Sequence, residues 1–175
     1  MTTTLVLGGA RSGKSTWAEA QLADAVDVEY VATSEMIDDP EWQHRVALHR
    51  ERRPATWRTT ETIDLVSVLA SDDPAPVLVD CAALWLDRVL NSVGAWDDKD
   101  GWRDDLAGAV ATLADAVAAT SRRVLIVSNE VGSGVVPATS SGRLYRDELG
   151  RLNMQLAAAC DEAYLLVAGL PLKLK

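Results

Sequence analysis

The feature that most constrains this chain is a short apolar stretch that runs into a glycine-rich loop and then into a helical pattern. Residues 3–7 are β-branched or aliphatic and carry no charge, which predicts a buried strand. Residues 8–15, Gly-Gly-Ala-Arg-Ser-Gly-Lys-Ser, fit the pattern G-x-x-x-x-G-K-[ST], and residues 16–22 have helical character. Strand, glycine loop and helix in this order are the context in which the pattern binds phosphate. The alternative, a glycine turn with a chance lysine, is disfavoured by the flanking strand and helix.

The chemistry of this loop follows from its backbone as much as from its side chains. Glycines allow successive N–H groups to curl around an anion, and the start of the next helix adds unpaired donors and the positive end of its dipole. Lys14 is expected to reach the β- and γ-phosphates of a nucleotide, and the Ser15 hydroxyl is expected to hold Mg²⁺. The predicted phosphate-binding residues are Gly8, Gly9, Ala10, Arg11, Ser12, Gly13, Lys14 and Ser15.

The rest of the chain alternates between strand and helix patterns. Strands are predicted at 28–32, 77–80, 123–128 and 162–167, with 170–174 returning as a hairpin, and helices at 64–70, 84–91, 102–120, 143–160 and from near Pro40 to before Pro54. This alternation implies βαβ units and a mostly parallel, twisted sheet with helices on both faces and an antiparallel C-terminal edge strand. Because the chain has 175 residues and no repeat or linker, we expect one α/β domain over 1–175.

The carboxyl ends of the predicted strands locate the site, because ligands of open α/β sheets bind there. These ends are Gly8, the stretch 33–35 (Thr-Ser-Glu), Asp80 and the stretch 129–130 (Asn-Glu), so four separate stretches should meet at one cleft. Asp80 closes an apolar strand, as the second acidic element of phosphate-loop enzymes does where it helps to hold Mg²⁺. The alternative is that Asp80 caps the helix that follows, and the preceding phosphate loop favours the metal role.

Composition excludes several classes of protein. The net charge of −9 argues against a nucleic-acid-binding protein, which usually carries a basic patch. Cys81 and Cys160 are too few for a disulfide framework and lack the clustered spacing of a zinc site, so both are expected to be reduced thiols of a cytoplasmic protein. No apolar run approaches about twenty residues and the N-terminus lacks a signal-peptide pattern, so no stable membrane insertion is expected.

Two further motifs do not fit their required context. A dinucleotide fingerprint G-x-G-x-x-G needs a glycine where the loop has Ala10. Residues 147–150 spell D-x-x-G, but they lie within a helical pattern and no N-K-x-D motif for guanine exists in the chain. We interpret residues 147–150 as the surface of a helix.

Residues 44–53, His-Arg-Val-Ala-Leu-His-Arg-Glu-Arg-Arg, form a basic segment in an otherwise acidic chain. The residues alone favour a solvated helix end, since charge runs usually face water and arginines suit the C-terminal end of a helix dipole. The alternative is an arginine clamp for phosphates around a histidine nucleophile, a role that imidazole can fill near neutral pH.

Several stretches together are similar to one family. The chain resembles the bifunctional adenosylcobinamide kinase / adenosylcobinamide-phosphate guanylyltransferases of cobalamin biosynthesis over nearly its whole length. The resemblance rests on L-V-L-G-G-A-R-S-G-K-S, A-T-S-E, H-R-E-R-R-P-A-T-W-R-T-T-E, L-V-D-C-A-A-L-W-L, N-E-V-G-S-G-V-V-P and the C-terminal stretch from G-R-L-N-M-Q to V-A-G-L-P. The glycine loop is shared by many families, whereas the arginine-rich histidine stretch and the N-E-V-G loop, in this order, are specific.

The resemblance implies roles for individual residues. The histidine that becomes guanylylated in the family corresponds to His49, whereas His44 has no matching role. Positions that contact GTP in the family correspond to the loop at 8–15 and to Thr33, Ser34, Glu35, Arg50, Glu51, Arg52, Arg53 and Glu61. Asp80 lies where the family has an acidic residue, and Ala83 replaces a threonine that is common at the nucleotide site. A P-loop NTPase (RecA-like) fold and a homotrimer are also implied.

The resemblance further implies two reactions that need Mg²⁺, ATP or GTP, and a corrinoid. The γ-phosphoryl group of the nucleotide would pass to adenosylcobinamide, with Lys14 stabilising the transferring group. His49 would then attack the α-phosphate of GTP, and adenosylcobinamide phosphate would take GMP from the histidine to give adenosylcobinamide-GDP. Two alternatives are a metabolite kinase without a covalent intermediate and a GTP-responsive binding module.

Overall fold

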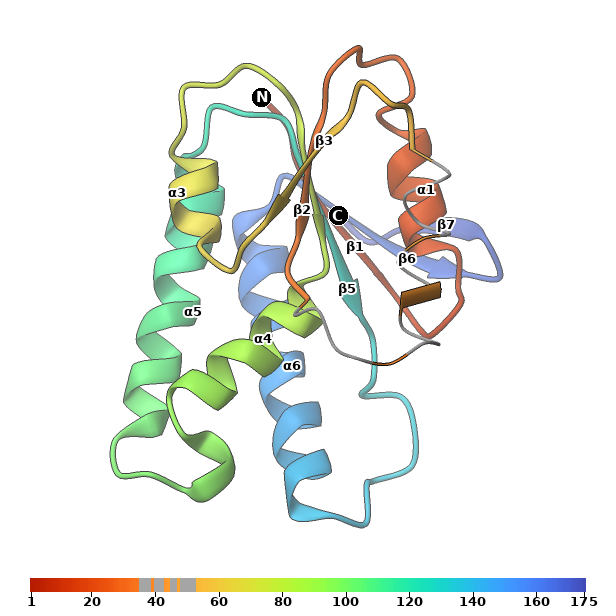
Figure 1. The fold of residues 1–175 in the computed structure, drawn as a ribbon. Coiled ribbons are helices and arrows are strands. Elements are labelled where there is room, and N and C mark those ends of the chain that lie inside the picture. The colour runs from red at the N-terminus through yellow and green to blue at the C-terminus, as the bar shows by residue number, and fades with distance from the viewer. Residues whose placement is uncertain (35–38, 40–42, 45–46, 48–52) are drawn as a thin grey trace.

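The computed structural model describes residues 1–34, 39, 43–44, 47 and 53–175. Its centre is a seven-stranded sheet with the order β3-β2-β4-β5-β1-β6-β7 (Figure 1). Every neighbouring pair is parallel except β6 and β7, which pair antiparallel. The strands are β1 (Thr3–Gly8), β2 (Glu29–Ala32), β3 (Arg58–Glu61), β4 (Val77–Asp80), β5 (Val124–Asn129), β6 (Glu162–Val167) and β7 (Leu170–Lys173). The predicted mostly parallel sheet with an antiparallel C-terminal edge is confirmed.

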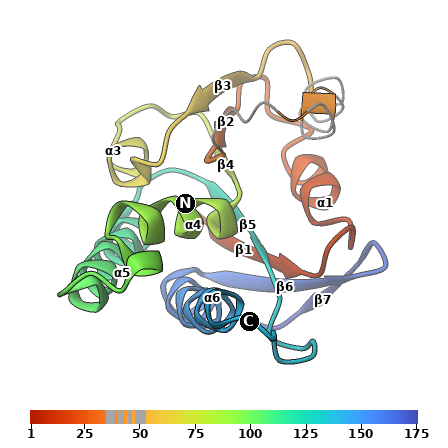
Figure 2. The same cartoon turned by 60° about the horizontal axis from the view of Figure 1, so that its bottom comes forward.

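Helices cover both faces of this sheet. Figure 2 shows α3, α4, α5 and α6 on one face and α1 on the other. The helices are α1 (Lys14–Ala20), α3 (Leu65–Leu69), α4 (Ala82–Ser92), α5 (Trp102–Ala119) and α6 (Ser140–Ala159), with a short 3₁₀ turn η1 (Ala95–Asp97). Because both faces are covered, the central strands β1, β4 and β5 are almost wholly buried, which explains their continuous apolar sequences.

The structure departs from the predicted elements at a few places. β3 was not expected, because Arg-Thr-Thr-Glu has no apolar alternation; it is a mostly exposed edge strand that pairs only with β2. α6 begins three residues before the predicted start, where the Thr139 side chain accepts a 3.1 Å hydrogen bond from the Gly142 amide. η1 lies between the helices predicted at 84–91 and 102–120. The helix expected between Pro40 and Pro54 lies largely outside the described residues.

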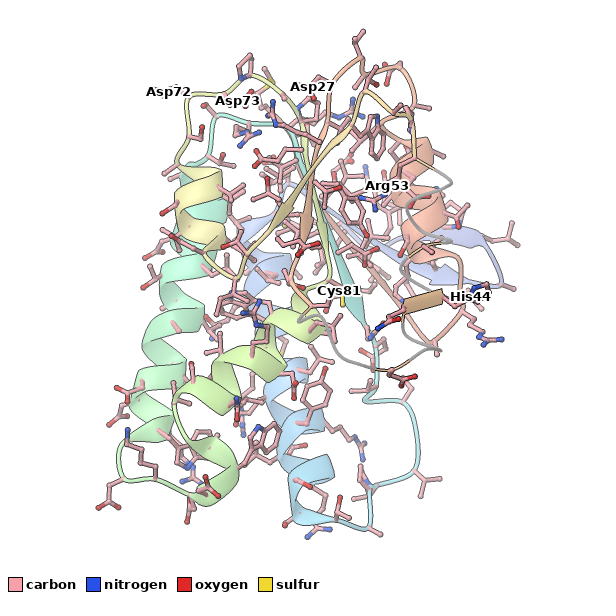
Figure 3. The ribbon with its side chains drawn as sticks, viewed as in Figure 1. Asp27, His44, Arg53, Asp72, Asp73 and Cys81 are labelled. Atoms are coloured by element: carbon pink, nitrogen blue, oxygen red, sulfur yellow. The ribbon has the colours of Figure 1, made fainter. Side chains whose placement is uncertain are left out.

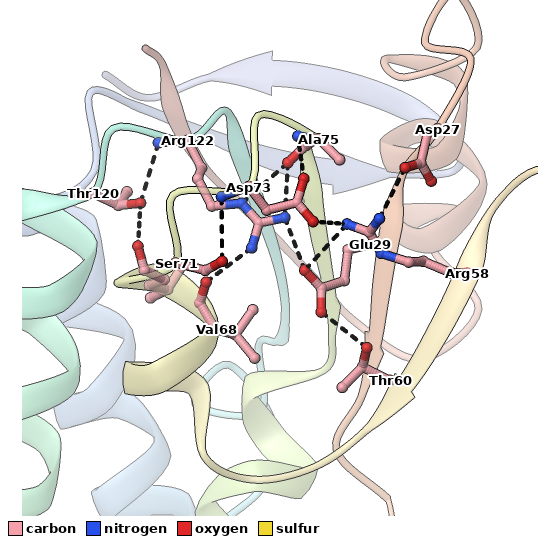
Figure 4. Close-up of polar contacts among 11 residues, drawn as sticks. Asp27, Glu29, Arg58, Thr60, Val68, Ser71, Asp73, Ala75, Thr120 and Arg122 are labelled. Carbon is pink, nitrogen blue, oxygen red and sulfur yellow. Dashed lines mark hydrogen bonds and ion pairs between the residues drawn. The ribbon is translucent and has the colours of Figure 1, made fainter.

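At the amino ends of the strands a buried arginine ties several elements together (Figure 4). Arg122 is 2 % exposed and donates to the carbonyl oxygens of Ala75 and Val68 at 2.8 and 2.9 Å. Its guanidinium also forms a 2.8 Å ion pair with Glu29 on β2. Arg58 on β3 lies 3.7 Å from the same carboxylate. Because these partners are mostly main-chain and carboxylate oxygens of the protein itself, we assign this cluster to stability.

No helix among the described residues is both long enough and apolar enough to cross a membrane.

Candidate nucleotide site

The loop between β1 and α1 is shaped by close backbone contacts. A Cβ atom on Gly8 would lie 2.6 Å from the Leu166 carbonyl oxygen, so only glycine fits at the end of β1. Gly13 has φ +95°, and a Cβ there would lie 3.1 Å from the Cα of Gly169 in the β6–β7 turn. The Gly169 amide also donates to the Ser12 carbonyl oxygen at 2.9 Å. The β6–β7 hairpin therefore supports the loop through main-chain contacts.

Lys14 begins α1 and turns back over the loop. Its side chain is buried, and its ammonium donates to the Gly9 carbonyl oxygen at 2.6 Å. Burial lowers the pKa of Lys14, while the charges of Cys81 and Asp80 oppose that shift. Lys14 therefore lies near enough to Asp80 for that charge to act on its ammonium.

Two hydroxyls of the loop differ in their surroundings. Ser12 Oγ is buried and has no hydrogen-bond partner within the described part of the chain. A buried polar atom without a partner is rare in folded proteins and is explained where a ligand completes it. Ser15, in the first turn of α1, is half-buried. Gly9, Ala10 and Arg11 are exposed, and Arg11 has a left-handed φ of 55°.

Asp80 ends β4 at the same edge of the sheet. Its carboxylate accepts a 2.9 Å hydrogen bond from the Tyr30 hydroxyl on β2. The N-cap residue of α4 is Cys81, so the structure does not support the helix-capping role that was the alternative for Asp80. Within the described residues no group of three or more His, Cys, Asp or Glu could hold a metal. A carboxylate and a serine hydroxyl beside a phosphate loop nevertheless fit Mg²⁺, which takes few protein oxygens and completes its shell with phosphates and water.

Three other predicted nucleotide contacts have defined positions. Thr33 is fully buried, and its hydroxyl both donates to the Cys81 carbonyl at 2.7 Å and accepts from the Cys81 amide at 3.1 Å. That hydroxyl therefore joins the ends of β2 and β4. Ser34 is half-buried just beyond it, and Glu61 ends β3 in register with Ala32 of β2.

Position 83 presents a methyl group to the interior. Ala83 is 1 % exposed in the first turn of α4, and its carbonyl accepts a 2.9 Å hydrogen bond from the Tyr145 hydroxyl. A side-chain contact from residue 83 to a nucleotide would lack the hydroxyl that the family commonly supplies.

The loop after β5 is tied to the end of β1. The Glu130 amide donates to the Gly8 carbonyl oxygen at 2.9 Å, and the Glu130 carboxylate accepts from the amides of Gly132 and Ser133 at 2.5 and 3.2 Å. On α6, Asn153 donates to the Asn129 carbonyl at 3.0 Å. The N-E-V-G stretch is thus held against the phosphate loop.

Part of the basic segment is placed. Glu35, His49, Arg50, Glu51 and Arg52 lie outside the described residues, so the structure does not position the predicted nucleophile. Arg53, which is labelled in Figure 3, is half-buried. Its guanidinium carbon lies 3.6 Å from the centroid of the Tyr30 ring. It also donates to the Thr59 hydroxyl at 3.2 Å. His44, which has no role in the prediction, is exposed. Arg53 is therefore not one of the solvated charges that the simpler interpretation of this segment expects.

Sequence reasoning missed Tyr30. The only signal was a hydroxyl-bearing side chain within a predicted strand, which does not reveal the carboxylate it will meet 50 residues later.

The comparisons with known proteins are decisive for the family. The model of the cobinamide kinase / cobinamide phosphate guanyltransferase family matches residues 4–174. The chain belongs to this family. The resemblance that the sequence predicted is thereby confirmed.

The relatives match along nearly their full length. The bifunctional adenosylcobalamin biosynthesis protein CobU of Salmonella typhimurium is 41% identical over 181 residues, covering 98% of this chain and 98% of its own. CobP of Pseudomonas aeruginosa, with the same description, is 42% identical over 178 residues, covering 98% and 96%.

Solved structures support the fold. An ATPase of a bacterial type III secretion system superposes with a TM-score of 0.63 at 11% identity, covering 98% of this chain and 56% of that one. The EscN ATPase of enteropathogenic E. coli gives 0.61 at 11% identity, covering 95% and 43%. The chain spans about half the length of these ATPases, and the likeness confirms the P-loop NTPase fold alone.

Proposed function

We propose that this protein phosphorylates adenosylcobinamide with ATP or GTP and then transfers GMP from GTP to adenosylcobinamide phosphate. The observation that carries the proposal is the intact phosphate loop within a chain that matches the bifunctional family over residues 4–174. The buried, unpartnered hydroxyl of Ser12 and the buried ammonium of Lys14 are the groups that a triphosphate would satisfy.

In the first reaction the substrate hydroxyl attacks the γ-phosphorus, the bond to the β–γ bridging oxygen breaks, and the nucleoside diphosphate leaves as the hydroxyl proton is released. Lys14 and the amides of residues 9–13 stabilise negative charge on the transferring group. Ser15 and Asp80 would hold Mg²⁺, which when bound neutralises charge on the phosphate oxygens. The Tyr30 hydroxyl donates to one oxygen of Asp80 and so helps to fix the orientation of that carboxylate.

In the second reaction neutral His49 attacks the α-phosphorus of GTP and pyrophosphate leaves. A phosphate oxygen of adenosylcobinamide phosphate then attacks the guanylyl-histidine and releases the imidazole. A neutral nucleophile avoids bringing two anionic phosphates together directly, and nearby arginines would bind the departing pyrophosphate. The remaining predicted contacts to GTP, namely Thr33, Ser34, Glu35, Arg50, Glu51, Arg52, Glu61 and Ala83, belong to this proposal.

A covalent-labelling experiment tests the second reaction. The protein is incubated with Mg²⁺ and GTP radiolabelled at the α-phosphate, and we expect acid-labile, base-stable label on the chain. His49→Ala should abolish the label, whereas the matched change His44→Ala should retain it because His44 is exposed and has no assigned role. Unlabelled wild-type protein that still converts ATP to ADP with adenosylcobinamide would instead indicate a kinase without a covalent intermediate.

The assembly and location also belong to the proposal. A homotrimer is supported by the edge strand β7, where Leu170 and Leu172 are 72% and 58% exposed, and sedimentation would test it.

The two buried, unpaired cysteines suit a reducing cytoplasm. The buried side chains of the described strands form one hydrophobic cluster, which supports a single domain over residues 1–175.

A further inference from the structure

Tyr30 contacts two parts of the site that are distant in the sequence. Its hydroxyl donates to an oxygen of Asp80 at 2.9 Å, and its ring lies 3.6 Å from the guanidinium carbon of Arg53. The side chain is almost fully buried, with 5% exposed. One aromatic side chain therefore touches both the carboxylate assigned to Mg²⁺ and the last arginine of the basic segment.

The neighbours of Tyr30 keep both contacts in place. Along the sheet, Tyr30 is in register with Leu78 of β4 and with Thr59 of β3. The Thr59 hydroxyl accepts a 3.2 Å hydrogen bond from the Arg53 guanidinium, so that group is held by a ring and by a hydroxyl on adjacent strands.

We propose that Tyr30 is a positioning residue that orients Asp80 for Mg²⁺ and anchors Arg53. One side chain would then hold both the carboxylate assigned to phosphoryl transfer and an arginine assigned to guanylyl transfer. The inference rests on the proposed function. His49 precedes Arg53 by four residues, and a chain of that length spans at most about 14 Å. Fixing Arg53 on the sheet thereby limits how far the His49 backbone can lie from Arg53 to that span.

Two substitutions separate the two contacts. Tyr30→Phe keeps the ring under Arg53 and removes the donor to Asp80, whereas Tyr30→Leu removes both. Tyr164→Phe is the matched control, because Tyr164 also loses a hydroxyl near a carboxylate, that of Glu162 at 3.4 Å, on the strand β6 at the other side of the sheet.

The first measurement is binding of a non-hydrolysable ATP analogue by calorimetry, with Mg²⁺ and with EDTA. Residues that orient a metal ligand typically change metal affinity by about 10-fold or more when removed, so Tyr30→Phe should raise the Mg²⁺ concentration needed for nucleotide binding by about 10-fold. Excess Mg²⁺ should restore nucleotide binding. Tyr164→Phe should bind as the wild type does. Asp80→Asn should show the same defect, and adding Tyr30→Phe to it should have little further effect.

The second measurement is the rate of covalent labelling from GTP at saturating Mg²⁺. Tyr30→Phe should label at close to the wild-type rate, and Tyr30→Leu should label about 10-fold more slowly, as expected when a supporting contact is removed. The inference would be overturned if both variants lost nucleotide binding and labelling rate equally, if excess Mg²⁺ did not restore these losses, and if both variants had a lowered melting temperature. That result would indicate a purely structural role for Tyr30. The inference would also be overturned if Tyr30→Phe kept the Mg²⁺ dependence of the wild type while Asp80→Asn bound Mg²⁺ and nucleotide more weakly.

Failure of the proposed function gives a different pattern. If the wild type takes no label, guanylyl transfer fails, while the calorimetric comparison of Tyr30→Phe with Asp80→Asn still decides whether Tyr30 orients the carboxylate. If Asp80→Asn binds Mg²⁺ and nucleotide normally, the metal assignment fails and the orienting role of Tyr30 is overturned with it.

Discussion

Lys14 is the residue on which phosphoryl transfer should depend most directly, because its ammonium is buried beside the loop and in the field of Asp80. Lys14→Ala should lower kcat of the kinase reaction by about 10²- to 10³-fold, the usual cost of removing one preorganised group that stabilises transition-state charge. The measurement is ADP formation in the presence of adenosylcobinamide. Lys173→Ala removes an exposed lysine on β7 that pairs with Glu162 of β6, and it should leave that rate unchanged. An unaffected Lys14→Ala enzyme would contradict the assignment of the loop.

The two cysteines should be unreactive in the folded protein. Burial raises the pKa of Cys81 and of Cys160 to about 12, whereas the pKa of a thiol in the unfolded chain is about 8.5. A raised folded pKa gives stability that is present below the unfolded value and is lost as pH rises toward the folded one. We expect iodoacetamide at pH 8 to modify neither thiol in the native protein and both in denaturant. Rapid alkylation of native protein would show that these side chains reach solvent.

At the scale of elements, the sequence was most informative where the interacting residues are consecutive. Residues 8–15 could be predicted because the strand, loop and helix that shape them adjoin one another. The pairings of Tyr30 with Asp80 and of Thr33 with Cys81 join residues 50 and 48 positions apart, so they depend on the register of β2 against β4. β3 was missed for a related reason, because an exposed edge strand needs no apolar pattern.

The β6–β7 turn should stabilise the phosphate loop, and Gly169 tests this. Gly169 has φ +81° and its amide donates to Ser12, so alanine would adopt a left-handed conformation at a cost of about 1–2 kcal/mol. We expect Gly169→Ala to lower the free energy of unfolding by that amount and to weaken ATP binding, measured by denaturation and by calorimetry.

The matched control is Gly150→Ala within α6, where an added Cβ meets nothing within 4 Å. Helical alanine restricts the unfolded chain more than glycine does, so this change should stabilise the protein by about 0.4–1 kcal/mol. If both variants shifted stability in the same direction, or if Gly169→Ala bound ATP normally, the turn would have no part in shaping the loop.

At the scale of the whole molecule, chemistry and stability are divided between the two ends of the sheet. The carboxyl ends of β1, β2 and β4 carry the polar groups that we propose bind the nucleotide. The amino ends carry the buried Arg122 cluster, where Arg58 adds ion pairs to Asp27 and Asp73 (Figure 4). This separation means that a change at one end can alter stability without altering the geometry of the other.

Arg122→Met tests that separation. Removing the guanidinium leaves the carbonyl oxygens of Val68 and Ala75 and part of the Glu29 carboxylate without their buried partner. Breaking such a pair costs about 3 kcal/mol or more, which for a chain of this size lowers the melting temperature by about 6–12 °C. The neighbouring change Arg123→Met, at an exposed contact to the Gln21 carbonyl, should cost under about 1 kcal/mol.

At 10 °C, where Arg122→Met remains folded, its affinity for ATP should equal that of the wild type. A weaker affinity there would show that the arginine cluster also sets the geometry of the nucleotide site, because stability and binding would then share one network.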